Sequence, residues 1–123
     1  MPIERVERLV TRYPHAEKRL FTASERAYCR GRRRSFEHLS ARVAAKEAVG
    51  KAFGTGIGRG ISWRDVEVLV ESSGRPSIRL HAEAERWAER WSLEQLDISL
   101  SHTGDLAVAY VVALVGARRP LEP

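Results

Sequence analysis

The sequence has one cysteine, Cys29, among its 123 residues. A single cysteine cannot form a disulfide within the chain or supply a cysteine-based metal cluster, so we interpret it as a small, partly buried side chain. Long apolar runs are also missing. The longest, at residues 106–115, is too short to span a bilayer as a helix, and the N-terminus has no stretch of signal-peptide type. We therefore expect a cytoplasmic protein with no membrane partner.

Several motifs of catalysis and nucleic-acid binding are absent. The glycines of residues 54–60 are not followed by the Lys-Ser or Lys-Thr of a P-loop. No Ser/His/Asp triad or zinc-type spacing of histidines is present, and no helix-turn-helix, finger or RNA-binding signature is found. A nucleic-acid-binding function would rest on charge alone, so we expect no nucleic-acid partner.

What the sequence does have is positive charge and enough apolar residues for a core. Lysine and arginine number 21 against 16 acidic residues, a formal net charge of +5, and 43% of the residues are hydrophobic. Such a chain attracts nucleic acid, phosphate-bearing ligands or an acidic protein surface. The basic residues gather at residues 30–34 and along the first predicted helix. An anion site should therefore lie toward the N-terminal half.

The spacing of apolar residues changes from helical to alternating along the chain. It predicts helices at residues 3–12, 22–31, 35–53 and 82–91, the second opened by a capping box of Thr22 and Glu25. Alternation predicts strands at residues 66–70, 78–80, 98–100 and 106–115. Pro14 should close the first helix, residues 54–60 should form a loop, and the tail after Gly116 should be frayed.

The order of these elements predicts the fold class. We expect one α+β domain over residues 1–123, with its core at about residues 3–115. A mainly antiparallel sheet should pack against the long helix of residues 35–53. Because small domains bury little of their surface, oligomerisation is a reasonable expectation.

The long helix carries an unusual set of charges among its alanines. Glu47 and Lys51 are four residues apart and share a face, and Lys46 lies beside that face. A carboxylate amid cations suits Mg²⁺ when phosphate oxygens complete its ligands, and a lysine there would neutralise phosphate charge. The alternative is an ordinary Glu–Lys pair on a solvated face. The spacing alone leaves both interpretations open.

Two further features also allow a functional and a structural interpretation. The glycines of residues 54–60 could bring backbone N–H groups close to a phosphate, or they could form a plain connecting loop. His102, in the run Ser101–Gly104, could be a base, a phosphate donor or a hydrogen-bonded structural residue. From the residues alone, the chain is a small basic α+β domain with a candidate anion site.

Taken together, the motifs resemble those of the bacterial holo-acyl-carrier-protein synthases. The run Arg42–Gly56, RVAAKEAVGKAFGTG, is similar to the signature of that family almost residue for residue. Other matching features follow in the right order: Phe21-Thr22 with Glu25, the Gly74-Arg75-Pro76 turn, and Ser99–Thr103 followed by Ala107 and Ala109. The resemblance covers nearly all of residues 3–115.

The resemblance implies a 4′-phosphopantetheinyl transferase-like fold and a transfer reaction. Members of the family bind coenzyme A with Mg²⁺ in a cleft between the subunits of a homotrimer. A serine hydroxyl of an acyl carrier protein attacks the β-phosphate, and 3′,5′-ADP leaves. The expected setting is fatty-acid or polyketide synthesis.

The resemblance also implies roles for individual residues. Glu47 would bind the metal and act as the base or hold the attacking water, and Lys51 would contact the pyrophosphate. His102 would contact phosphate near the reacting centre. The remaining coenzyme-binding candidates are Arg34, Arg42, Gly54 and Thr103, and the docking surface for an acidic helix of the carrier protein would comprise Arg5, Leu9, Arg12 and Arg19.

The sequence departs from the family pattern at its start. The family begins with a short strand whose aspartate is a second magnesium ligand, whereas Ile3–Val6 aligns with the helix after that strand. That aspartate would fall before Met1. Two explanations are consistent with this: a shortened or misassigned start, or loss of the strand. The second would leave a catalytically weak or inactive module that binds coenzyme A and the carrier protein.

Overall fold

The computed structural model describes residues 1–116, in which helices come first and strands later. In chain order the elements are α1 (Ile3–Arg12), α2 (Pro14–Leu20), α3 (Ala23–Arg30), α4 (Ser35–Phe53), the 3-10 helix η1 (Trp63–Asp65), β1 (Val66–Val70), β2 (Pro76–Leu80), α5 (Ala82–Arg90), β3 (Leu93–Thr103) and β4 (Leu106–Val115). The predicted α+β class is confirmed. The predicted fraying of the tail concerns residues 117–123, which lie outside the described residues. Among residues 1–116, no helix has both the length and the apolar character needed to cross a membrane.

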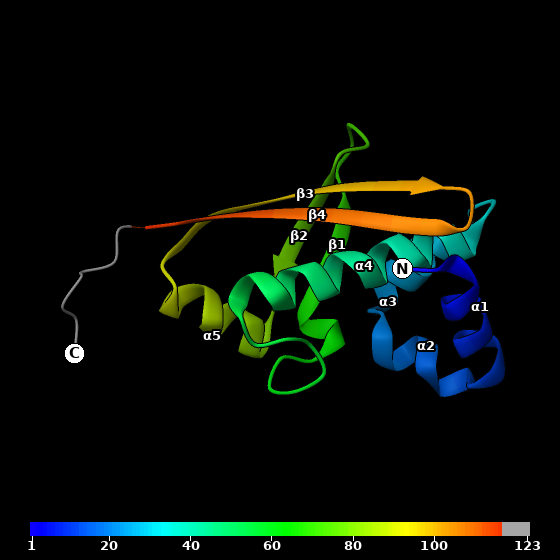
Figure 1. The fold of residues 1–123 in the computed structure, drawn as a ribbon, viewed down its shortest axis with the longest axis horizontal. Coiled ribbons are helices and arrows are strands. Elements are labelled where there is room, and N and C mark those ends of the chain that lie inside the picture. Colours follow the sequence, from blue (N-terminus) through cyan, green and yellow to red (C-terminus); the bar gives the residue numbers. More distant parts are fainter. Residues whose placement is uncertain (117–123) are drawn as a thin grey trace.

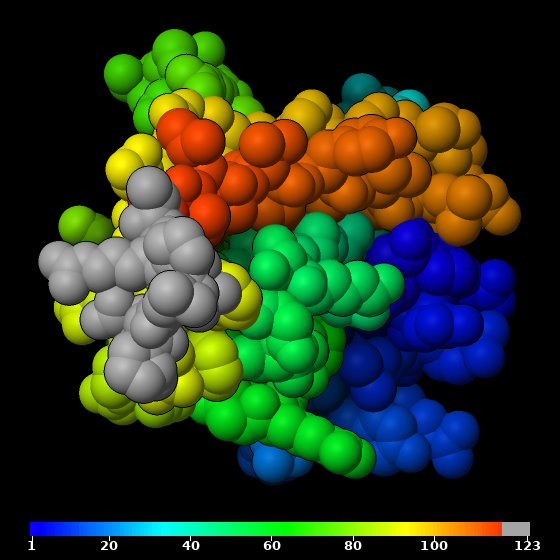
Figure 2. Space-filling model, turned by 60° about the vertical axis from the view of Figure 1, so that its left-hand side comes forward, coloured from blue at the N-terminus to red at the C-terminus, as the bar shows by residue number. Residues whose placement is uncertain are grey.

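The strands are antiparallel, as predicted, but they form two hairpins instead of one sheet. β1 pairs with β2, and the longer β3 pairs with β4. The long β3–β4 hairpin lies along α4, with α1–α3 gathered at one end of that helix and α5 near the other (Figure 1). In Figure 2 the two long strands cover the upper side of the molecule, above α4 and the N-terminal helices.

Helix α4 lies between two groups of core residues. Val43, in its first half, packs with Val6 and Phe21 of the N-terminal segments. Val49, in its second half, packs with Val66 and Ala84 of β1 and α5. One helix thus belongs to both groups of core residues, and the single domain over residues 1–123 stays a prediction.

Three local features differ from the sequence-based predictions. Pro14 closes α1 but also opens α2, a helix that we did not predict, because a proline at the first helical position has no N–H to lose. The run Ser101–Thr103 lies inside β3, and the tight turn is at residues 104–105. The strand predicted at residues 98–100 is longer in the structure, where β3 runs from Leu93 to Thr103.

The first two residues pair with the beginning of β4. The N-terminal ammonium of Met1 donates to the Ala107 carbonyl, and the Ala107 N–H donates to the Met1 carbonyl, both at 2.8 Å. Pro2 forms an antiparallel bridge with Leu106. Met1 is therefore held beside β4, close to the middle of α4.

Candidate active site

Glu47 and Lys51 lie together at a hollow between α4 and β4. The hollow measures about 340 Å³ and is lined by Met1, Ala44, Glu47, Ala48, Lys51 and residues 107–109. Alanines on both elements leave the space open. Glu47 is half-buried and Lys51 is exposed, and within residues 1–116 no ion pair joins them to each other or to another residue. The described residues therefore do not form the ordinary Glu47–Lys51 pair that was the alternative.

Lys46, which we placed beside this charged face, points into the core instead. Its ammonium donates to Oε1 of Glu25 at 2.8 Å and to the carbonyls of Trp63 and Val66 at 2.8 and 2.6 Å. Neighbouring residues on a helix are about 100° apart. Burial of Lys46 on one side thus directs Glu47 toward the hollow, and Lys46 itself is not available to a phosphate.

Arg34 and His102 meet at the beginning of α4, around a carboxylate that sequence reasoning missed. Glu37 Oε2 is 3.6 Å from His102 Nε2 and 3.9 Å from Arg34 Nη1. His102 pairs across the hairpin with Ala107, which lines the hollow. The backbone of His102 is therefore one strand spacing, about 5 Å, from the backbone of Ala107. The sequence signal that could have pointed to Glu37 was its place in the first turn of a predicted helix, where acidic residues are favoured.

Arg42 is enclosed between α3 and α4 and is only 2% exposed. Its Nη1 donates to the His38 carbonyl at 3.1 Å, and its guanidinium lies 4.7 Å from the centre of the Tyr28 ring. Burial and the charge of Arg42 lower the pKa of His38. In this chain Arg42 does not line the hollow at Glu47, nor do Arg34, His102 and Thr103.

Gly54 ends α4 and begins the glycine-rich loop. It adopts a left-handed conformation with φ of 79°, and its N–H donates to the carbonyls of Gly50 and Lys51. The loop backbone returns closely over the helix, because Gly56 N–H also donates to the Gly50 carbonyl at 3.0 Å. The predicted loop at residues 54–60 is confirmed, and it begins about two helical turns after Glu47 and one turn after Lys51.

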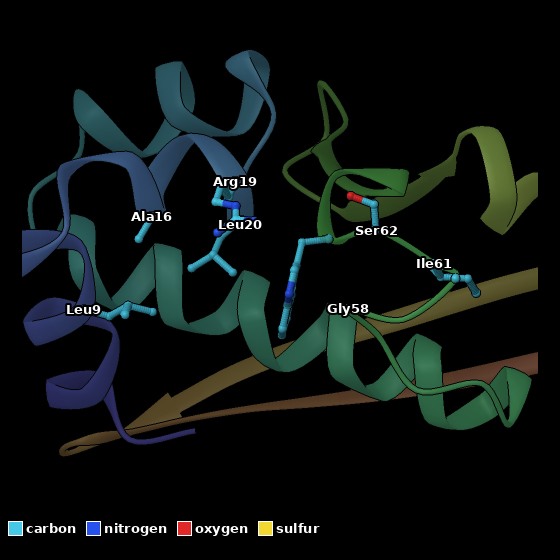
Figure 3. Close-up of a pocket in the computed structure, with 9 residues that line it drawn as sticks. Leu9, Ala16, Arg19, Leu20, Gly58, Ile61 and Ser62 are labelled. Atoms are coloured by element: carbon cyan, nitrogen blue, oxygen red, sulfur yellow. The ribbon is translucent and has the colours of Figure 1, made fainter.

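The four residues predicted to dock a carrier protein, Arg5, Leu9, Arg12 and Arg19, are all exposed on α1 and α2. Leu9 and Arg19 also line a groove of about 510 Å³. Figure 3 shows this groove between α1 and α2 on one side and the loop carrying Gly58, Ile61 and Ser62 on the other. Sequence reasoning did not predict that this loop forms one wall of the groove, because the loop and the helices come together only in the folded chain.

The described residues hold no group of three or more His, Cys, Asp or Glu side chains that could bind a metal on their own. Among residues 1–116, Glu47 is the one carboxylate that lines the hollow between α4 and β4. A single carboxylate still suits Mg²⁺, since this ion takes one or two protein oxygens and obtains the rest from phosphates and water. The residues present therefore fit a magnesium ion that is bound together with a phosphate ligand.

Comparisons with known proteins find relatives along most of this chain. The sequence model of the 4′-phosphopantetheinyl transferase superfamily matches residues 1–111. A holo-acyl-carrier-protein synthase of Moorella thermoacetica is 46% identical over 113 residues, which cover 92% of this chain and 86% of the relative.

Two solved structures share the fold. The holo-acyl-carrier-protein synthase of Neisseria meningitidis matches with a TM-score of 0.84 and 29% identity, over 93% of this chain and 92% of that one. The enzyme of Bacillus anthracis, in complex with coenzyme A (3′,5′-ADP), matches with a TM-score of 0.77 and 30% identity, over 94% and 91%.

Proposed function

Because the chain belongs to the holo-acyl-carrier-protein synthases of the 4′-phosphopantetheinyl transferase superfamily, we propose that it transfers 4′-phosphopantetheine from coenzyme A to a serine of an acyl carrier protein. The observation that carries this proposal is the hollow in which Glu47 and Lys51 face β4 across a floor of alanines. Fatty-acid or polyketide synthesis in the cytoplasm is the proposed setting, as the resemblance implies.

The transfer makes one phosphorus–oxygen bond and breaks another. The serine oxygen bonds to the β-phosphorus of coenzyme A, the pyrophosphate P–O bond breaks, and 3′,5′-ADP leaves with that electron pair. The serine proton passes to a base, for which Glu47, a water held by Glu47, and His102 are candidates. The Lys51 ammonium would stabilise the charge that develops on the departing phosphate.

A magnesium ion fits at Glu47, where it would neutralise the pyrophosphate and polarise its oxygens. Glu47 is half-buried and unpaired within residues 1–116, so its carboxylate is free to bind a cation. Lys51 is four residues along the same face. The two side chains would therefore hold the metal and the phosphate charge side by side.

The remaining coenzyme-binding candidates support an assembly with sites between subunits. Arg34, His102 and Thr103 lie at the other end of α4 from Gly54, and Arg42 is enclosed between helices. β4 also presents a row of exposed apolar side chains, Leu106, Val108, Tyr110, Val112 and Leu114, and Val108 lines the hollow. A homotrimer that covers this row would bring Arg34, His102 and Thr103 of one subunit to the hollow of the next.

The carrier protein is proposed to dock on α1 and α2. Arg5, Arg12 and Arg19 supply exposed positive charge, and Leu9, 37% exposed, supplies an apolar contact at the groove of Figure 3. Charge of this kind speeds encounter with an acidic partner.

Mass spectrometry of an apo carrier protein tests the proposal. Incubation with the chain, coenzyme A and Mg²⁺ should add the mass of phosphopantetheine to the carrier. Glu47→Gln and Lys51→Met should each lower the rate by about 100-fold or more, while the exposed control Glu89→Gln stays close to wild type.

Two other outcomes would contradict parts of the proposal. Normal transfer by Glu47→Gln would show that the reaction does not need this carboxylate as a metal ligand. Calorimetric binding of coenzyme A without a mass gain at any Mg²⁺ concentration would indicate a binding module without catalysis.

A further inference from the structure

A second hollow lies beside the groove of Figure 3, and none of the residues predicted for the site lines it. It measures about 400 Å³ and is lined by Thr22, Ala23, Arg26, Ser62, Arg64, Asp65 and His81. Ser62 lines both this hollow and the groove that contains Leu9 and Arg19. We call it the Arg26–Arg64 pocket. Because the two hollows share a wall, one partner could occupy both.

The two guanidinium groups of the pocket have no carboxylate partner within residues 1–116. Arg26 forms no ion pair, and its Nε is buried without a hydrogen-bond partner. Arg64 donates only a long bond of 3.4 Å from Nη1 to the Lys18 carbonyl. By contrast, Arg8 and Arg86 each form a 2.8 Å ion pair with a neighbouring glutamate.

The acidic groups near the pocket are already engaged. Asp65 Oδ2 accepts the Ser62 N–H at 3.1 Å. Glu67 accepts the Thr22 hydroxyl at 2.6 Å and lies 2.9 Å from His81 Nε2. These hydrogen bonds hold the two carboxylates in place without neutralising them. The pocket lining nevertheless carries two arginines against one carboxylate, Asp65, and each guanidinium group can bind a carboxylate through two parallel N–H bonds.

We propose that the Arg26–Arg64 pocket binds a carboxylate from an acidic segment of the carrier protein, as a second anchor beyond α1. This inference rests on the proposed transfer to a carrier protein. The pocket shares no lining residue with the hollow of Glu47 and Lys51, whereas it shares Ser62 with the groove of Leu9 and Arg19. Its place favours the protein substrate over coenzyme A.

The test measures transfer kinetics with the carrier protein and coenzyme A varied in turn. The double variant Arg26→Gln/Arg64→Gln should raise the KM for the carrier protein by about five- to twentyfold, since two partly exposed charge contacts are lost. The KM for coenzyme A should stay within about twofold. The affinity of the double variant for the carrier should also depend less steeply on salt.

The matched control removes two positive charges elsewhere. Arg79→Gln/Arg90→Gln changes exposed residues of β2 and α5 that line none of these hollows. An equal rise in the carrier KM for this control, or an unchanged carrier KM for the pocket variant, would overturn the proposal. Arg26→Lys/Arg64→Lys should restore part of the affinity, because lysine keeps the charge without the planar fork.

Failure of this inference is distinguishable from failure of the proposed function. Transfer by the wild-type enzyme tests the function alone. If the wild type transfers nothing, fluorescence anisotropy of labelled apo carrier with the wild type and both double variants still tests the pocket. Equal affinities for all three proteins would overturn the inference, and weaker binding by the pocket variant alone would support it. Unfolding midpoints of the wild type and the pocket variant should match, because Arg26 and Arg64 make no ion pair within residues 1–116. The midpoint of the control is measured alongside, because this variant loses the contact of Arg90 with the Trp87 ring.

Discussion

The ammonium of Lys46 lies 2.8 Å from Oε1 of Glu25, and both side chains are fully buried although 21 residues separate them. Burial lowers the pKa of Lys46 from its ordinary value of 10.5, and the Glu25 carboxylate opposes that shift. Glu25 also accepts N–H bonds from Thr22 and Val68, at 2.9 Å each. One carboxylate thus joins the beginning of α3 to α4 and to β1.

Replacing Lys46 with methionine should destabilise the fold strongly. The substitution leaves Glu25 charged and buried without its cation, which costs about 3–5 kcal/mol in the free energy of unfolding. Urea denaturation followed by circular dichroism measures the loss. The matched control, Lys51→Met, changes an exposed lysine and should lie within about 0.5 kcal/mol of wild type. Similar losses in both variants would contradict a structural role specific to Lys46.

Glu67 should make stability depend on pH in the acid range. Burial raises the pKa of Glu67, but the hydrogen bonds from Thr22 and His81 outweigh it and hold the pKa below its ordinary value of 4.5. The folded carboxyl is then more acidic than the unfolded one. Its stabilisation is present above pH 4.5 and is lost as the pH falls through the folded pKa.

Urea midpoints of wild type and Glu67→Gln across this range provide the measurement. Near neutral pH the variant should be less stable by about 1–2 kcal/mol, because a charged acceptor of two hydrogen bonds is lost. This difference should shrink as the pH falls below 4.5. A difference that stayed constant over the range would show that Glu67 does not titrate with folding.

Gly50 should resist substitution because the glycine-rich loop crosses α4 at this position. A Cβ on Gly50 would lie 2.8 Å from the carbonyl carbon of Gly56. Gly50→Ala should therefore destabilise the protein by about 1–2 kcal/mol, since the overlap exceeds the gain in helix propensity. The control Gly31→Ala meets nothing within 4 Å and should be neutral to within about 0.5 kcal/mol. Equal thermal midpoints for both variants would contradict the close approach.

Val112 should be needed for assembly more than for folding of the subunit. It is 67% exposed within the apolar row on β4. Val112→Asp should leave the far-ultraviolet spectrum unchanged, but it should reduce the sedimenting mass to that of one chain and abolish transfer. The control Ser72→Asp adds the same charge at the exposed β1–β2 turn and should keep the assembly. A wild-type mass for the Val112 variant would exclude this row as the interface.

Local signals predicted much of the fold. The bounds of α4 follow from a long run of good helix formers that ends in glycine, and the capping box of Thr22 and Glu25 is present as predicted. The β1–β2 hairpin follows from alternation and its turn residues. Helix α2 escaped prediction because its seven residues, PHAEKRL, are too few to establish an apolar period.

The site was predictable only where contacts are local. Lys46 and Lys51 lie on one alanine-rich helix that packs against neighbours on several sides, so no polar face distinguishes the buried lysine from the exposed one. Glu25 was recognised as a capping residue, whereas its bond to Lys46 needed the three-dimensional fold. The grooves beside Ser62 likewise form only when η1 packs against α2.

The network around Lys46 has a consequence for the order of folding events. Its hydrogen bonds close sequence separations of 17, 20, 21 and 43 residues. The hairpins and single helices, in contrast, are closed by short segments and can form early. We expect the Lys46–Glu25 pair to form late, after the barrier to folding has been crossed, because its burial needs α3, α4 and β1 to be packed together. The buried ion pair should therefore mainly lower the unfolding rate. Its loss should shorten the lifetime of the native state without slowing refolding.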